Sequence, residues 1–290
     1  MLIFHDPECT TYTPSSGPEQ PARTIKSVER LKARHPGWEW RLPVPVDDAV
    51  LRLAHTEGHL ERLAQPVDFD EDTPYIAGIL DHARRSVWGA IAAADAARVE
   101  RRPAFSLMRP PGHHATRHEA MGFCYLNQVA IAALYLRRQG VGRVAVWDFD
   151  AHHGNGTEAI LNNKDGIIFV SVHQSPGYPG TGTEDFDNCR NYTIAPRTTR
   201  DDHMRLLELS WQHVLAYQPE VVLVSAGFDA YVRDPITAMS LEAEDFAQLG
   251  RWIGEAPFPC AAVLEGGYSE DLPLLIDSFL TAWDGRVSVG

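Results

Sequence analysis

Cysteine is scarce in this sequence, and no two cysteines are spaced as metal or redox pairs are. The four cysteines (Cys9, Cys124, Cys189 and Cys260) are scattered along 290 residues. They form no CxxC motif, so nothing indicates a disulfide framework or a zinc site made of thiolates. We therefore expect reduced thiols and a cytoplasmic protein.

Long hydrophobic runs are also lacking. No apolar stretch approaches the roughly 18 residues that a membrane-spanning helix needs. The first ten residues, MLIFHDPECT, do not show the basic segment and long apolar run of a secretory signal. We expect no membrane partner.

Basic residues are outnumbered by acidic ones. The chain has 26 Lys and Arg against 39 Asp and Glu, which gives a formal net charge of −13. This balance disfavours a nucleic-acid backbone as the main partner. It is compatible with a cationic substrate, although a need for solubility explains it equally well. A hydrophobic content of 44% is ordinary for a globular protein, and the length suffices for a large core.

Short apolar runs alternate with helical patterns from residue 103 onward. The predicted strands are 104–108, 144–147, 166–172, 220–225 and 260–264, and the predicted helices are 125–138, 201–217, 241–254 and 270–283. Before them we predict a short strand at 2–4, helices at 21–35, 47–64 and 75–101, and an acidic loop at 65–74. This alternation predicts an α/β fold, a parallel sheet with helices on both faces. No repeat or long linker divides the chain, so we predict one domain over residues 1–290.

One stretch carries an unusual number of ionisable side chains. Residues 143–157 read RVAVWDFDAHHGNGT, in which Asp148, Asp150, His152 and His153 come at the end of an apolar run. Such groups are tolerated at a buried strand only when they are paired or hold a metal. Asp150 and His152 stand at i and i+2, so at a strand end their side chains point to the same side. Oxygen and nitrogen donors suit Zn²⁺, Mn²⁺ or Fe²⁺. A helix-capping aspartate beside a core histidine would account for only part of this cluster.

Polar side chains also follow three other predicted strands. They are His113 and His114 after 104–108, Asp229 after 220–225, and Glu265 and Tyr268 after 260–264. Ligands of open α/β sheets bind beyond the carboxyl ends of the strands. We therefore expect these side chains to converge on one site.

Five motifs in this order resemble those of the zinc-dependent histone deacetylases, a family that includes bacterial acetylpolyamine amidohydrolases and acetoin-utilisation proteins. They are RPPGHHA (109–115), GFCYLN (122–127), DFDAHHGNGT (148–157), AGFD (226–229) and EGGY (265–268). The Arg-Pro-Pro before the histidine pair, and Asn155 in place of an aspartate, resemble the class II side of the family. The resemblance covers nearly the whole chain and implies the single-domain arginase–deacetylase fold.

The resemblance implies two metal sites. Asp150, His152 and Asp229 would hold one catalytic Zn²⁺, leaving open positions for water and the substrate carbonyl. A structural monovalent cation, K⁺, would lie near Asp148, Asp150, His152, Ser171 and Val172.

The resemblance also implies catalytic roles. His114 would be the general base that later protonates the leaving amine, and His113 its electrostatic partner. Asp148 would hold His113, and Asn155 would orient His114. Tyr268 would donate its hydroxyl to the carbonyl oxygen as negative charge develops there.

Five further positions would contact the substrate. Phe123, beside Gly122, and Tyr178 would line a narrow apolar tunnel suited to a linear acylated amine, although Phe123 also fits a core position. Asp72 matches a rim aspartate that holds the substrate backbone in relatives. Ile236 stands where some polyamine-selective relatives carry an acidic residue.

The sequence therefore predicts a zinc-dependent amidohydrolase that removes acetyl or short acyl groups from acetyl-lysine side chains or acetylated small amines. An acetylpolyamine deacetylase is the first alternative, and a catalytically inactive module that binds acyl-lysine is the second. A di-manganese ureohydrolase of the arginase type would need further bridging aspartates, but Asp229 is followed by Ala230 and Tyr231, and His153 by Gly154. The long insertion by which some polyamine enzymes dimerise is missing before the histidine pair, and the sequence leaves the oligomeric state open.

Overall fold

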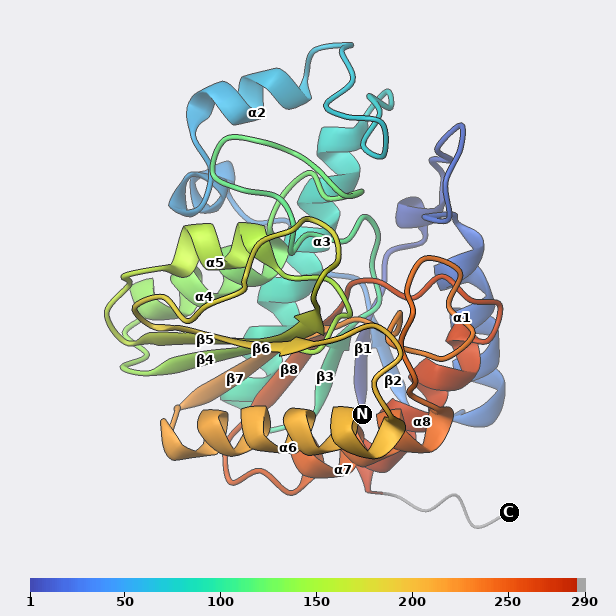
Figure 1. Cartoon of the computed structure of the whole chain (residues 1–290). Coiled ribbons are helices and arrows are strands. Elements are labelled where there is room, and N and C mark those ends of the chain that lie inside the picture. Colours follow the sequence, from blue (N-terminus) through green and yellow to red (C-terminus); the bar gives the residue numbers. More distant parts are fainter. Residues whose placement is uncertain (286–290) are drawn as a thin grey trace.

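The predicted strands and two further ones form one parallel sheet of eight strands in the computed structural model, which describes residues 1–285 (Figure 1). Across the sheet the order is β2-β1-β3-β8-β7-β4-β5-β6, and every neighbouring pair is parallel. The strands are β1 (Leu2–Phe4), β2 (Glu39–Arg41), β3 (Ala104–Ser106), β4 (Val144–Asp148), β5 (Ile167–Gln174), β6 (Cys189–Ile194), β7 (Val221–Ala226) and β8 (Cys260–Leu264). This arrangement confirms the predicted fold class.

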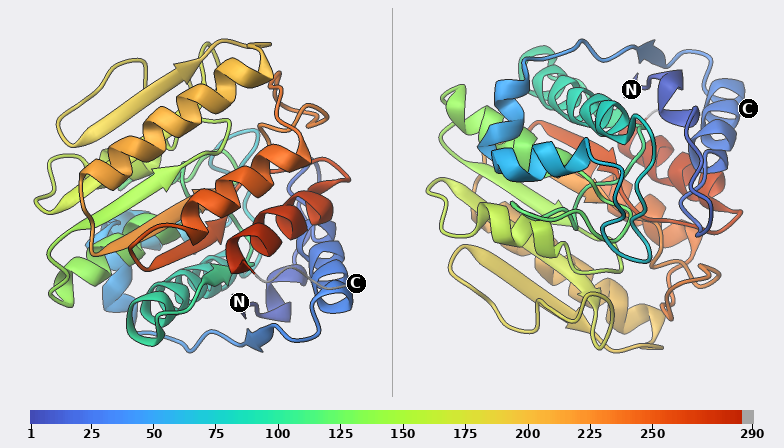
Figure 2. Two further views of the ribbon diagram at one scale, coloured as in Figure 1. Left: turned by 90° about the horizontal axis from the view of Figure 1, so that it is seen from below. Right: turned by 90° about the horizontal axis from the view of Figure 1, so that it is seen from above.

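Helices cover both faces of the sheet. One face carries α6, α7 and α8, and the other carries α3, α4 and α5 (Figure 2). The helices are α1 (Ala22–Arg34), α2 (Glu57–Leu63), α3 (Ile79–Asp95), α4 (Gln128–Arg138), α5 (Asn155–Leu161), α6 (Arg200–Ala216), α7 (Ala243–Gly254) and α8 (Leu272–Asp284). Two 3₁₀ turns lie at Pro7–Thr10 and Asp48–Leu53, and a π turn at Ala96–Glu100 extends α3. None of the helices in residues 1–285 has the length and apolar character needed to cross a membrane.

The core consists of two apolar layers, one on each face of the sheet. Along β4, Val144 and Val146 pack into one layer, while Ala145 and Trp147 pack into the other. A strand buried on both faces has no reason to alternate polar with apolar residues, which explains its uninterrupted apolar run. The Trp147 indole N–H donates to Ser210 Oγ of α6 at 2.9 Å, which satisfies its buried polar atom.

Several predicted boundaries were wrong. The predicted helix 47–64 is a 3₁₀ turn followed by α2, because the Thr56 side chain accepts a hydrogen bond from the His59 amide and starts a new helix. The predicted helix 75–101 begins only at Ile79, after Gly78 with a φ of +78°. Strands β2 and β6 and helix α5 were not predicted.

The four strands expected to lead into the site are adjacent. Strands β3, β8, β7 and β4 are consecutive neighbours in the middle of the sheet. Their carboxyl ends therefore deliver four loops, distant in sequence, to one edge of the sheet.

Candidate active site

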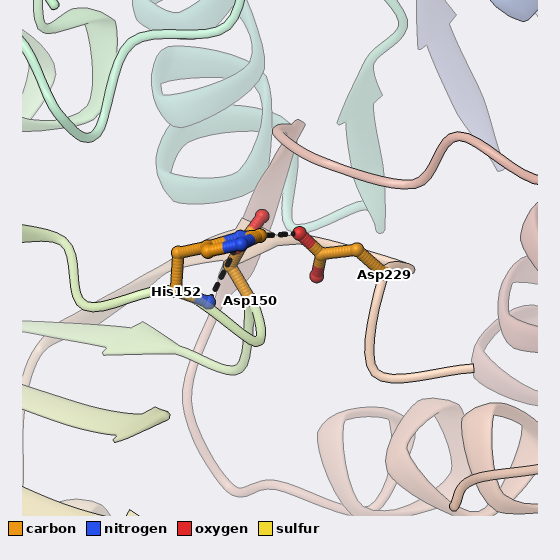
Figure 3. A group of neighbouring side chains, drawn as sticks. All are labelled: Asp150, His152 and Asp229. Carbon is orange, nitrogen blue, oxygen red and sulfur yellow. Dashed lines mark hydrogen bonds and ion pairs between the residues drawn. The ribbon is translucent and has the colours of Figure 1, made fainter. Parts of the chain in front are cut away.

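Three side chains beyond β4 and β7 form a compact cluster of metal-ligand atoms. Asp150, His152 and Asp229 each place one such atom within 4.8 Å of the others. His152 Nδ1 lies 2.8 Å from Asp229 Oδ2 and 3.2 Å from Asp150 Oδ1 (Figure 3). Both carboxylates are fully buried. Two carboxylates and one imidazole are a donor set that zinc accepts.

The charge balance of this cluster also fits a divalent cation. Burial and the neighbouring Asp150 raise the pKa of Asp229 to about 7, although His152 acts in the opposite direction. The protein's own groups therefore leave the negative charge of Asp229 only partly compensated, which suits a site for a divalent cation.

Backbone amides orient the two carboxylates. The Ala151 amide donates to Asp229 Oδ1 at 2.8 Å, and the Gly266 amide donates to Asp150 Oδ2 at 2.7 Å. Gly227 and Gly266 allow this crowding, since a Cβ at Gly227 would lie 2.1 Å from Asp150 Oδ2 and one at Gly266 would lie 2.4 Å from Asp229 Oδ2. The two glycines are thus required by close approach to the ligands.

His113 is held in its charged form. Its Nδ1 lies 3.0 Å from Asp148 Oδ2, and its Nε2 lies 3.7 Å from Asp150 Oδ1. Burial opposes a charge on this ring, but Asp150 and Asp148 outweigh burial and raise the pKa of His113 to about 10. Two carboxylates therefore favour the imidazolium form of this ring, one through a hydrogen bond and one through its charge.

His114, by contrast, is held neutral. Burial, together with the positive charges of His113 and His152, lowers the pKa of His114 well below its usual value. Its Nδ1 lies 2.8 Å from Asn155 Oδ1, an oxygen that can only accept, so Nδ1 carries the ring proton. Nε2 is left free to take a proton. The two rings are 4.0 Å apart between centroids.

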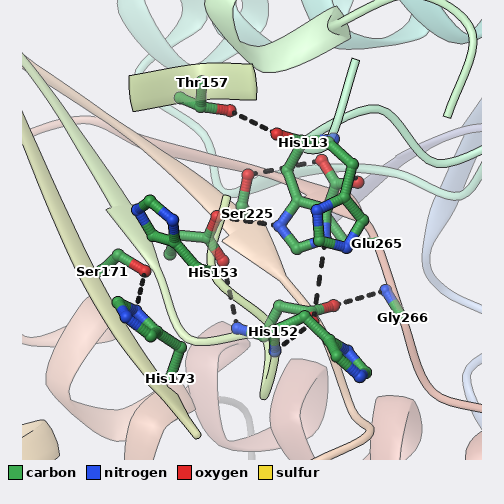
Figure 4. A network of polar contacts seen from close by, with 12 residues as sticks. His113, His152, His153, Thr157, Ser171, His173, Ser225, Glu265 and Gly266 are labelled. Carbon is green, nitrogen blue, oxygen red and sulfur yellow. Dashed lines mark hydrogen bonds and ion pairs between the residues drawn. The ribbon is translucent and has the colours of Figure 1, made fainter. Parts of the chain in front are cut away.

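Sequence reasoning did not assign a role to Glu265, which turns out to be a main support of the histidine pair. Its fully buried carboxylate accepts hydrogen bonds from the amides of Gly112 at 2.7 Å and His113 at 3.1 Å. Ser225 Oγ contacts its other oxygen at 3.3 Å (Figure 4). The chain offered one clue, a carboxylate directly after an apolar strand, but no spacing rule links residue 265 to residue 112.

The predicted tunnel residues lie against the histidines. The ring of Tyr178 is 5.1 Å from that of His114, edge to face, and 6.2 Å from that of His152. The rings of Phe123 and Tyr268 are 5.6 Å apart. A Cβ at Gly122 would lie 2.6 Å from the His114 ring, so the backbone itself forms part of the wall there.

The remaining predicted positions differ in how closely they approach this cluster. Asp72 is exposed, and its charge, with that of Asp70, adds to burial in raising the pKa of Tyr178 above its usual value. This coupling indicates that the acidic loop borders Tyr178. Ile236 is 41% exposed on the loop after Asp229.

Three of the five residues predicted for K⁺ lie on two paired strands, and the other two, Asp150 and His152, follow β4. Asp148 and Ser171 are direct partners in the register of β4 and β5, and Val172 follows Ser171. Ser171 Oγ also lies 2.8 Å from His173 Nδ1 (Figure 4).

Comparisons with known proteins agree with this geometry. A family model described as the histone deacetylase domain matches residues 17–281. A probable deacetylase of Archaeoglobus fulgidus is 38% identical, over 92% of this chain and 81% of its own. A histone deacetylase-like amidohydrolase of Pseudomonas aeruginosa is 35% identical, over 86% of this chain and 71% of its own. The crystal structure of an acetylpolyamine aminohydrolase from Burkholderia pseudomallei aligns with a TM-score of 0.90 at 28% identity, covering 98% of both chains.

Proposed function

Because the chain belongs to the histone deacetylase family and is a deacetylase of the arginase–deacetylase fold, we propose that its reaction takes place at the cluster of Asp150, His152 and Asp229. These three residues would hold one catalytic Zn²⁺. The observation that carries the proposal is the pair of histidines beside them, with His113 Nδ1 on the carboxylate of Asp148 and His114 Nδ1 on the amide oxygen of Asn155. Hydrolysis of an amide needs a group that takes a proton from water and later gives one to the leaving amine.

Each residue of the site has its own role in the proposed reaction. Bound zinc supplies Lewis acidity and lowers the pKa of water to about 7. His114 Nε2 takes a proton from the attacking water and then gives it to the amine as the C–N bond breaks. Asn155 keeps the tautomer of His114 that permits this, and Asp148 keeps His113 charged beside it. Tyr268 donates its hydroxyl to the carbonyl oxygen as negative charge develops there.

The substrate of the proposal is a linear acylated amine, either an acetyl-lysine side chain or an acetylated small amine. The aromatic rings of Phe123, beside Tyr268, and of Tyr178, beside His114, would form the walls of an apolar tunnel that fits an unbranched chain. Asp72 at the rim would hold the substrate backbone or attract its cationic end. Ile236 carries no charge, which favours acceptance of several amines over selection of a polyamine.

The proposal extends to the surroundings of the site. Residues 1–290 would act as one catalytic domain. K⁺ would lie near Asp148, Asp150, His152, Ser171 and Val172 and stabilise the strand ends that carry the zinc ligands. The four cysteines are all unpaired and buried, which supports a reducing compartment such as the cytoplasm.

Substrate competition is the direct test. The zinc-loaded protein is assayed for kcat/KM on an acetyl-lysine peptide and on an acetylated polyamine, with chelator-treated protein as the control. We expect turnover of both, with the peptide preferred by about tenfold, a difference of about 1.4 kcal/mol in transition-state binding. A strong preference for the polyamine would support the alternative, an acetylpolyamine deacetylase. Absence of turnover on both would overturn the proposal in favour of an acyl-lysine-binding module.

A further inference from the structure

A loop of twelve residues follows the zinc-ligand candidate Asp229 and carries no assigned role beyond the exposed Ile236. The 230–241 loop leaves and returns at one place, where the Leu241 amide donates to the Ala230 carbonyl at 3.0 Å and the Val232 amide donates to the Leu241 carbonyl at 2.8 Å. Its two ends are therefore pinned together, and the intervening residues project as a closed loop.

Asp234 is the buried polar residue of this loop, with 7% of its surface exposed. Its Oδ2 accepts a hydrogen bond from the backbone amide of Tyr268 at 2.7 Å, and its Oδ1 accepts one from the amide of Ile236 at 3.1 Å. One carboxylate thus joins the main chain of Tyr268 to the main chain of the 230–241 loop.

The backbone of Tyr268 needs support from outside its own segment. It follows Gly266 and Gly267, and Gly267 adopts a φ of +113°, which side-chain-bearing residues rarely adopt. Two glycines contribute no side chains that could pack and hold the turn. On one side, Arg23 Nε donates to the Gly267 carbonyl at 2.8 Å, and its guanidinium lies 4.7 Å from the centre of the Tyr268 ring. On the other side, the Asp234 carboxylate accepts a hydrogen bond from the amide of Tyr268.

Burial of the Asp234 carboxylate costs free energy unless hydrogen bonds or an opposite charge compensate for the lost water. Within residues 1–285 no basic side chain forms an ion pair with it, so amide hydrogen bonds are its compensation. One of these two bonds goes to the residue proposed to stabilise the oxyanion.

We propose that Asp234 is a positioning residue for deacetylation, which fixes the main chain of Tyr268 so that the phenol hydroxyl stays at the place where charge develops on the carbonyl oxygen. The inference rests on the proposed role of Tyr268. A hydroxyl that acts on developing charge affects the transition state more than the bound substrate. Loss of Asp234 should therefore lower kcat and leave KM nearly unchanged.

The test is a double-mutant cycle on the zinc-loaded, full-length protein with the acetyl-lysine peptide. Asp234→Ala is compared in the wild type and in Tyr268→Phe. In the wild type we expect kcat to fall by about 10- to 100-fold, because a displacement of about 1 Å can cost that much. In Tyr268→Phe, which has no hydroxyl left to position, the same substitution should change kcat by less than about twofold.

Three further variants separate positioning from folding. Asp234→Asn keeps an acceptor oxygen and should retain more activity than Asp234→Ala. Asp234→Glu keeps the charge but moves the oxygens, so it should show the same dependence on the Tyr268 hydroxyl even if the alanine variant fails to fold. Arg233→Ala removes a neighbouring side chain that contacts Asp271 and the hydroxyl of Tyr231 but not Tyr268, and it should leave kcat unchanged. Zinc affinity, measured by chelator competition, should stay at the wild-type value in all of them.

The outcomes distinguish the two levels of the argument. An equal loss of kcat in the wild-type and Tyr268→Phe backgrounds, or a loss of zinc affinity, would overturn the role of Asp234 while the proposed function stands. Wild-type kcat in Tyr268→Phe alone would overturn the proposed role of Tyr268 itself.

Discussion

Two histidines that are adjacent in sequence have pKa values shifted in opposite directions, and their Nδ1 atoms have different partners. His113 Nδ1 contacts the carboxylate of Asp148, whereas His114 Nδ1 contacts the amide oxygen of Asn155. A carboxylate favours the imidazolium, and an amide oxygen fixes a tautomer without favouring a charge. Asn155 thus fixes the tautomer of His114 and adds no negative charge beside it.

Burial alone also lowers the pKa of a histidine that lies far from the site. His203 on α6 is 2% exposed, and burial lowers its pKa to about 4. The unfolded chain binds a proton at about pH 6.5. The contribution of neutral His203 to the free energy of unfolding is therefore fully present above pH 6.5 and is lost as the pH falls towards 4.

Urea unfolding of the metal-free protein at pH 7 and at pH 4.5 tests this shift. Between these two values the free energy of unfolding of the wild type should fall by about 2 kcal/mol more than that of His203→Gln, which binds no proton. Parallel decreases in the two proteins would show that His203 titrates alike in the folded and unfolded states.

The strands show how much of the fold the sequence could predict. The central strands β4, β7 and β8 were predicted because burial on both faces makes them uninterrupted apolar runs. The edge strands β2 and β6 were not, since β2 has only three residues and residues 190–193 of β6 lie at the surface or only partly buried. Local pattern carries no information about an edge strand that is held mainly by its neighbour.

The candidate site divides in the same way. The motif residues were located from the sequence, and the structure brings Asp150, His152 and Asp229 together. Their roles remain predictions. Glu265 and Asp234 could not be assigned, because their partners are backbone amides of residues 112, 113 and 268, and any residue has an amide.

The turn after β7 brings the backbone of Gly227 very close to the Asp150 carboxylate. Gly227→Ala would place a Cβ 2.1 Å from Asp150 Oδ2 and push this carboxylate out of position. We expect zinc affinity to fall by about 10- to 100-fold in chelator competition, as for other changes beside metal ligands.

Gly58→Ala in α2 is the matched control, because no atom lies within 4 Å of its Cβ position. It should keep wild-type zinc affinity and, as an alanine in a helix, stabilise the fold by up to about 1 kcal/mol. Equal zinc affinity in the two variants would contradict the crowding at Gly227.

Across the whole molecule, a buried ion pair ties the N-terminal segment to the strand end that leads to the histidine pair. The Glu19 carboxylate accepts from Arg109 Nε at 2.6 Å and Nη2 at 2.7 Å, and from Arg23 Nη1 at 3.1 Å. Arg109 is fully buried. Burial opposes ionisation of Glu19, but Arg109 and Arg23 outweigh it and hold the pKa of Glu19 below its usual value.

Glu19→Gln should therefore destabilise the protein by about 3–5 kcal/mol, because it leaves buried guanidinium groups without a counter-charge. Glu57→Gln makes the same change at an exposed pair with Arg52 and should leave the stability nearly unchanged. Thermal and urea unfolding of both variants measure the difference. Similar losses at the two positions would mean that the Glu19 cluster adds no more stability than a surface pair.

The order of strands has a consequence for synthesis of the chain on the ribosome. Strand β8 is the last to be made, yet it lies between β3 and β7 in the finished sheet. Before residues 260–264 emerge, no strand joins β3, which leads to the histidine pair, to β7 and β4, which lead to the three metal-ligand candidates. Completion of the sheet, and with it the approach of the four loops at one edge, therefore has to wait for the strand that inserts between its two halves.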